Sequence, residues 1–206
     1  MNKFVSAINT TTGRLITCVL ITILWALFAY RHFNAFRQTG EWIYLLFCFS
    51  EVVTILMLAI RRAPETVSTD PLDWIFAVGG TLMPLVFSPA ASGILPVAKY
   101  LVSVGSCMQI LGLFSLNRSL AFVAAKRELK VGGMYRFMRH PLYASYLIMF
   151  SGYVLANTTL TNVAVYFLTL GLLFVRMLRE EKHLAQDPAY CAYMQAVPYR
   201  LVPFVL

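Results

Sequence analysis

The chain has 206 residues, of which 59% are hydrophobic and only 13% are charged, and its formal net charge is +8. Water-soluble domains contain about 45–50% apolar and about 25% charged residues. The composition therefore excludes an ordinary soluble domain and favours an integral membrane protein.

Six apolar stretches follow one another along the chain. They span residues 15–30, 42–60, 74–87, 97–116, 142–155 and 160–178. A helix needs roughly 18–20 apolar residues to cross about 30 Å of hydrocarbon, and the third and fifth stretches are shorter than that. The pattern predicts an all-α fold, a polytopic transmembrane helical bundle with about six hydrophobic segments and five to six crossings. The last two segments are expected to form a helical hairpin.

The basic residues predict the orientation of this bundle. Residues 118–140 carry several of them, whereas the loops at 88–96 and 156–161 carry no charge. The basic residues are Arg118, Lys126, Arg127, Lys130, Arg136 and Arg139. Because short cytoplasmic loops retain Lys and Arg, this segment, both termini and the tail at 179–200 are expected on the cytoplasmic side. Arg31 and Arg37, in an expected outer loop, are exceptions.

The first apolar run is not followed by a small-residue cleavage site, so it is expected to stay in the protein as a helix. Membrane topology and anionic lipid head groups account for the positive net charge. Membrane lipids are therefore expected partners, and no nucleic-acid partner is predicted.

Two features of the apolar runs bear on chemistry. The cysteines, including Cys18 and Cys48, are scattered without metal-ligand spacing, so no metal site is predicted. Glu51 lies midway along the second run. A carboxylate there is costly unless it is neutral or paired, so Glu51 is expected to face the bundle interior. A functional site and a structural hydrogen bond from a protonated Glu51 are both open interpretations.

Two connections contain helix-start signals. The polar loop at 61–74 predicts a helix N-cap at Asp70 or Asp73. Further along, the glycine pair at 132–133 breaks any helix, and Pro141 suits the first turn of the next one. Arg139 and His140 then lie at a helix N-terminus, where free N–H groups and the helix dipole favour an anionic ligand. The alternative is that the basic and aromatic side chains here only anchor the helix at the lipid head groups.

A second polar cluster closes the last apolar run. Arg176 and Glu180 lie one helical turn apart and are expected to pair, whereas Glu181 falls on a different side and His183 on a neighbouring face. A helix that leaves the membrane often becomes charged in this way without any catalytic role. Both clusters, however, are cytoplasmic by charge and flank the same hairpin, so they are expected to meet.

At these two clusters the sequence resembles the membrane-embedded methyltransferases of the isoprenylcysteine carboxyl methyltransferase family, which are related to phospholipid methyltransferases. The resemblance covers about the last hundred residues, and Ser145 stands where that family usually has glycine. The matching residues are Gly133, Tyr135, Arg139, His140, Pro141, Tyr143, Gly152, Asn157, Arg176, Glu180, Glu181, Leu184, Tyr190, Tyr193 and Pro203.

The resemblance implies an S-adenosylmethionine-dependent methyltransferase that acts on a lipophilic or lipidated substrate and releases S-adenosylhomocysteine. Its implied reaction is carboxyl methylation of an isoprenylcysteine-like acceptor. Residues 1–206 then form a single membrane domain, in which 1–116 are mainly scaffold helices and 117–206 the cofactor-binding and catalytic half. The implied catalytic residues are Arg176 and Glu180. The implied cofactor-binding residues are Tyr135, Arg139, His140, Pro141, Tyr143 and Glu181.

Several alternatives stay open at the level of sequence. A phospholipid or another small lipophilic amine or thiol is a second acceptor class, for which Glu180 or His183 is the candidate base. A membrane sterol-type reductase that uses NADPH and a small transporter with Glu51 as an ion-coupling site are alternatives of other classes. The expected location is a bacterial inner membrane, with multiple crossings and the active site on the cytoplasmic side, and an endoplasmic reticulum membrane is the alternative that would look the same in sequence.

Overall fold

The computed structural model describes residues 11–60, 62, 66–126 and 128–203, and this part of the chain is mostly helical. Two short strands, β1 (Thr66–Val67) and β2 (Ala125–Lys126), pair antiparallel. The helices are α2 (Thr11–Thr39), α3 (Ile43–Ala59), α4 (Pro71–Leu82), α5 (Lys99–Leu116), α6 (Pro141–Ala156), α7 (Leu160–Leu184) and α8 (Pro188–Ala196). The predicted all-α fold is confirmed.

Each of the six apolar stretches forms a helix, and the third ends in a 3₁₀ turn, Met83–Val86. The helical segments Pro96–Ser119 and Leu160–Leu184 are long and apolar enough to cross a membrane. Shorter apolar helices cover Ile43–Leu58, Pro71–Val86 and Pro141–Ala156. Two helices of the described chain thus combine the length and the apolar composition that a crossing needs, and six crossings stay a prediction.

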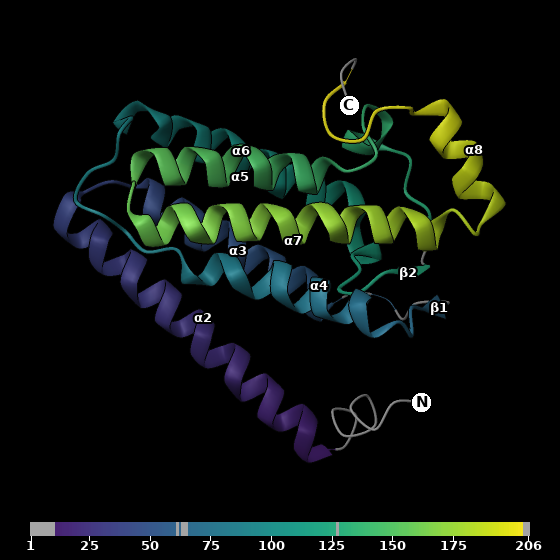
Figure 1. The fold of residues 1–206 in the computed structure, drawn as a ribbon, viewed down its shortest axis with the longest axis horizontal. Helices are drawn as coiled ribbons and strands as arrows, with labels where there is room; N and C mark the ends of the chain where they lie inside the picture. Colours follow the sequence, from purple (N-terminus) through teal and green to yellow (C-terminus); the bar gives the residue numbers. More distant parts are fainter. Residues whose placement is uncertain (1–10, 61, 63–65, 127, 204–206) are drawn as a thin grey trace.

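The helices α3 to α7 run side by side, and α2 leans away from them toward its N-terminal end (Figure 1). The turns between α2 and α3 and between α6 and α7 lie at one end of this bundle. The β1–β2 pair, α8 and the C-terminal segment lie at the opposite end. The predicted hairpin of the last two apolar segments is confirmed, because only residues 157–159 connect α6 to α7.

The first connection is shorter than the sequence suggested. Arg31 and Arg37 lie within α2, not in an outer loop, because no proline or glycine lies between Gly13 and Gly40. Gly40 has a φ of 70° and ends the helix. The Arg31 guanidinium donates to Ser88 Oγ at 2.9 Å and to the Leu85 carbonyl at 2.8 Å. Its charge therefore ties α2 to the turn after α4.

Close contact between α5 and α6 depends on glycine. A Cβ atom added at Gly105 would lie 2.6 Å from the backbone nitrogen of Met149, and one at Gly152 would lie 2.8 Å from the Ala98 carbonyl oxygen. Small residues at such crossings let two helix backbones approach closely. The packing of these two helices fixes the position of the α6 N-terminus, where the predicted site begins.

Substitution Gly105→Ala is expected to destabilise the protein by about 1–3 kcal/mol, because the added methyl group meets the α6 backbone. The matched control is Gly171→Ala in α7, where an added Cβ meets no atom within 4 Å. The control is expected to be neutral, or stabilising by up to about 1 kcal/mol, because alanine is the better helix former. Unfolding of both variants in detergent checks the difference, and equal stability would contradict the close-packing explanation.

Candidate functional site

A cavity opens at the end of the bundle that carries the strands and α8, and it encloses about 870 Å³ of empty space, the open mouth included. Six of the eight predicted site residues line it: Tyr135, Arg139, His140, Tyr143, Arg176 and Glu180. The two polar clusters therefore meet, as the sequence predicted. Pro141 and Glu181 are not among the lining residues.

Tyr135 is positioned by a turn that requires glycine. Gly133 has a φ of 58°, and a Cβ atom on it would lie 2.3 Å from Ser115 Oγ. The same Ser115 hydroxyl accepts a hydrogen bond from the Met134 N–H at 3.2 Å. The 3₁₀ turn Gly133–Arg136 then directs Tyr135 into the cavity wall. The predicted helix break at the glycine pair is confirmed.

The start of α6 follows the capping prediction. His140 is the N-cap residue and Pro141 occupies the first helical turn. The C-terminal segment covers this helix start. The Arg139 N–H donates to the Tyr199 carbonyl and the His140 N–H donates to the Arg200 carbonyl, each at 2.9 Å. These two N–H groups are therefore not available to an anionic ligand, whereas the use of the N–H groups within the first turn of α6 stays a prediction.

Glu181 lies behind the cavity wall. Its Oε1 accepts from Arg139 Nε at 2.8 Å and lies 3.0 Å from His140 Nε2, and its Oε2 accepts from Arg200 Nε at 2.8 Å. Glu181 is 6% exposed. Both oxygens are hydrogen-bonded, so Glu181 holds Arg139, His140 and Arg200 in place. Its predicted direct contact with the cofactor stays a prediction.

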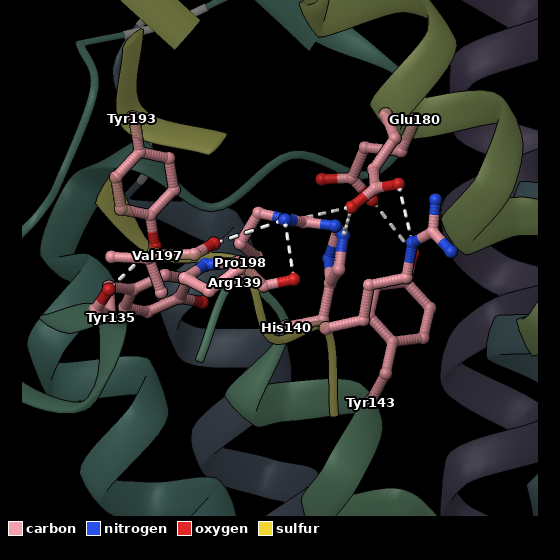
Figure 2. Close-up of polar contacts among 10 residues, drawn as sticks. Tyr135, Arg139, His140, Tyr143, Glu180, Tyr193, Val197 and Pro198 are labelled. Carbon is pink, nitrogen blue, oxygen red and sulfur yellow. Dashed lines mark hydrogen bonds and ion pairs between the residues drawn. The ribbon is translucent and has the colours of Figure 1, made fainter. Parts of the chain in front are cut away.

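Arg139 faces both the Glu181 network and the cavity. Its Nη1 donates to the carbonyls of Val197 and Pro198, each at 3.0 Å (Figure 2). Its Nη2 forms no hydrogen bond with the described residues, and Arg139 lines the cavity. A guanidinium nitrogen fixed in this way offers two N–H groups to a carboxylate or phosphate oxygen.

Arg176 and Glu180 lie on the same cavity but do not pair with each other in the described chain. The guanidinium of Arg176 donates to Thr81 Oγ1 at 3.2 Å and to the carbonyls of Ala121 at 3.3 Å and Phe122 at 2.9 Å. Glu180 Oε2 accepts from the Tyr143 hydroxyl at 2.7 Å (Figure 2). The predicted pair is wrong because partners from other elements bind both side chains.

His183, the alternative base, does not line the cavity. Its Nε2 lies 3.5 Å from Thr66 Oγ1 in β1.

Of the two predicted N-cap candidates, Asp70 caps α4, because its side chain accepts a hydrogen bond from the Leu72 N–H at 2.9 Å. Asp73 instead pairs with Arg179, which also bonds Asp70. These ion pairs fasten the connection before α4 to the end of α7.

Tyrosine rings supply much of the aromatic surface of the cavity. Tyr190 and Tyr193 line it together with Tyr135, and the Tyr193 hydroxyl donates to the Tyr135 carbonyl at 2.6 Å. Burial raises the pKa of Tyr193 to about 12 and holds the pKa of Tyr135 well above its usual value. Both phenols are therefore neutral at pH 7, and their faces can contact an aromatic ring or a cation.

Sequence reasoning matched Tyr190 and Tyr193 to the family pattern but gave them no role in the cavity. The two tyrosines are three residues apart, a spacing that was visible only as part of the motif, and nothing local indicated that α8 folds back over the site. Among the described residues, no group of three His, Cys, Asp or Glu side chains has a geometry suited to a metal ion.

Substitution Gly133→Ala is expected to destabilise the protein by about 1–3 kcal/mol, because alanine disfavours the positive φ and its methyl group collides with Ser115. The neighbouring Gly132→Ala is the control, since Gly132 has a φ of −95° and open space around its Cα. Thermal unfolding in detergent compares the two variants. A Gly133→Ala protein as stable as Gly132→Ala would contradict this account of the turn.

Comparison with known proteins agrees with this geometry. A model of the phospholipid methyltransferase family matches residues 89–187, and this family includes isoprenylcysteine carboxyl methyltransferase-like proteins. A search of curated proteins found no match. The matched range contains all eight predicted site residues, and the predicted family resemblance is confirmed. Residues 89–187, which form most of the candidate site, are thus similar to the phospholipid methyltransferase family.

Proposed function

We propose that this protein is an S-adenosylmethionine-dependent methyltransferase that acts in the membrane on a lipophilic acceptor, with carboxyl methylation of an isoprenylcysteine-like molecule as its reaction. One observation carries the proposal. The family-matched region brings Arg139, Arg176 and Glu180 to one cavity at the end of an apolar helical bundle. The family match favours methyl transfer over the reductase and transporter alternatives.

The lining residues suit the parts of S-adenosylmethionine, which supplies an electrophilic methyl group when it is bound. The open Nη2 of Arg139 suits its carboxylate. The faces of Tyr190 and Tyr193 suit its adenine ring or sulfonium, the latter as a cation–π contact of about 0.5–2 kcal/mol. Glu180 adds a negative charge near which an ammonium or sulfonium is stabilised.

The chain's own contribution to the reaction is positioning. A carboxylate acceptor is already ionised at pH 7 and needs no general base. Arg176 can bind one carboxylate oxygen and leave the other free to attack, because its guanidinium is held by neutral oxygen atoms and keeps its full charge. The apolar bundle around it removes water from the nucleophile, and orientation and desolvation supply much of the acceleration.

An amine of a phospholipid is the second candidate acceptor. The name of the matched family favours it, and Glu180 is the candidate base because its carboxylate lines the cavity. In that case Glu180 accepts the proton that the amine loses, and Tyr143 orients the carboxylate through its 2.7 Å hydrogen bond.

The proposed location is a bacterial inner membrane, with the cavity on the cytoplasmic side. The support is the distribution of charge, since the basic segment around residues 118–139 and the tail after α7 lie at the cavity end of the bundle. The shorter apolar helices α3, α4 and α6 complete a multi-pass arrangement in this proposal.

Binding of S-adenosylmethionine to the purified full chain in detergent tests the cofactor assignment. Arg139→Ala is expected to weaken binding about 10- to 100-fold, because a hydrogen-bonded charge is lost. The control is Arg136→Ala, an exposed arginine that does not line the cavity. Calorimetry measures both, and circular dichroism verifies folding. Absence of binding by the unmodified protein would contradict the cofactor assignment, and wild-type affinity in Arg139→Ala would contradict the role of this arginine.

Arg176→Ala is expected to lower kcat/KM for methyl transfer to S-farnesylcysteine about 100-fold or more while leaving the Kd for S-adenosylmethionine within about threefold. The matched control is Arg179→Ala, one turn along α7 but outside the cavity lining. Transfer of a radiolabelled methyl group measures the rates. Equal rates for the two variants would exclude Arg176 as the acceptor-binding group. Transfer to phosphatidylethanolamine and not to S-farnesylcysteine would favour the amine candidate.

A further inference from the structure

A second cavity lies between the helices and holds about 450 Å³ of empty space, its open mouth included. Its lining includes Glu51 and Thr54 of α3, Thr81 of α4, and Arg176 of α7. Arg176 and Tyr146 line both this cavity and the one described above. The second cavity therefore adjoins the proposed reaction centre from the side of the apolar helices.

Glu51 is a buried carboxylate with few hydrogen-bond partners. It is 5% exposed, and its Oε1 lies 3.5 Å from Gln109 Nε2, at the outer limit of a hydrogen bond. That amide instead makes its good contact with Thr54 Oγ1 at 2.9 Å. No described residue donates to Glu51 Oε2 or forms an ion pair with this carboxylate. The prediction that Glu51 faces the bundle interior is confirmed.

A second buried acceptor next to Glu51 also has no partner. Gln109 is fully buried, and its Oε1 forms no hydrogen bond within the described chain. Buried acceptors without donors are costly, and each one calls for an explanation. Glu51 lines the second cavity and Gln109 does not, so the acceptor that a ligand can reach there is the Glu51 carboxylate, and a ligand with N–H groups complements it.

The cavity wall therefore carries one acidic and one basic side chain. Arg176 supplies N–H donors, whereas Glu51 supplies oxygen acceptors. This combination matches a head group that contains both an anionic group and an ammonium group. Glu51 lies outside the family-matched residues 89–187, so this property comes from the scaffold half of the chain.

We propose that Glu51 binds the ammonium group of a zwitterionic acceptor in the second cavity, while the anionic group of the same acceptor faces Arg176. This rests on the proposed function, because it assigns the acceptor side of the methyl transfer site. Glu51 is then a specificity-determining residue. The ammonium donates the hydrogen bonds that the Glu51 carboxylate lacks, because Gln109 is its only hydrogen-bond partner among the described residues and lies 3.5 Å away.

Binding of paired amphiphiles to the full chain in detergent tests this inference. S-farnesylcysteine carries a free ammonium and its N-acetyl derivative does not, and phosphatidylethanolamine is compared with phosphatidylethanol in the same way. The unmodified protein is expected to bind the ammonium member of at least one pair about tenfold more tightly, and the pair that responds identifies a lipidated amino acid or a phospholipid as the source. Glu51→Gln is expected to reduce this preference to less than about twofold.

Two controls keep the outcome clear. Glu51→Asp retains the charge and is expected to keep a preference for the ammonium member, whereas Glu51→Gln is not. The affinity for S-adenosylhomocysteine is expected to be unchanged in both variants, which reports folding and the cofactor site separately. Equal binding of both members of each pair by the unmodified protein, or an intact preference in Glu51→Gln, would overturn the inference. If the unmodified protein does not bind S-adenosylhomocysteine at all, the result would instead count against the proposed function.

Discussion

The buried carboxylate of Glu181 joins three parts of the chain that are far apart in the sequence. It holds Arg139 and His140 at the start of α6, and it holds Arg200 in the C-terminal segment. Removing one partner from a buried ion pair typically costs about 3–5 kcal/mol, because the remaining charge is left uncompensated. The position of the cavity wall therefore depends on this one carboxylate, which itself does not line the cavity.

The same network holds the Arg139 side chain in one orientation at the start of α6. Arg139 donates from Nε to Glu181 and from Nη1 to the carbonyls of Val197 and Pro198. Its side chain is thereby fixed on two sides, and Nη2 has no hydrogen-bond partner among the described residues. A cation that is held before its ligand arrives loses little conformational entropy on binding. The C-terminal segment thus acts as part of the site although it lies beyond the family-matched range.

Local and periodic features of this structure were predictable from sequence, and contacts between distant elements were not. The apolar runs gave the helices, and the glycine and proline signals around Gly133 and Pro141 gave the turn and the start of α6. The pairing of Arg176 with Glu180 was inferred from spacing alone. It failed because spacing says nothing about the carbonyls of 121–122 or the Tyr143 hydroxyl, which bring better partners from other elements.

The role of Glu181 illustrates the same limit. A motif marks the residue as important, yet direct binding and the positioning of another side chain leave the same mark in a single sequence. The arrangement of Arg139, His140 and Arg200 around both carboxylate oxygens shows a positioning role that the sequence did not indicate. The closeness of Tyr190 and Tyr193 to the cavity was hidden for a related reason, since α8 reaches the site only through the turn after α7.

Arg176 occupies the place where the two cavities adjoin, and its partners there are neutral. Carbonyl and hydroxyl oxygens orient a guanidinium without cancelling its charge, whereas a carboxylate partner such as Glu180 would have done so. The pairing expected from the sequence would therefore have weakened the very property that an acceptor-binding arginine needs. By engaging Glu180 through Tyr143 and Arg176 through backbone carbonyls, the fold keeps both charges available at one cavity, so that opposite charges on two ligands can be bound side by side.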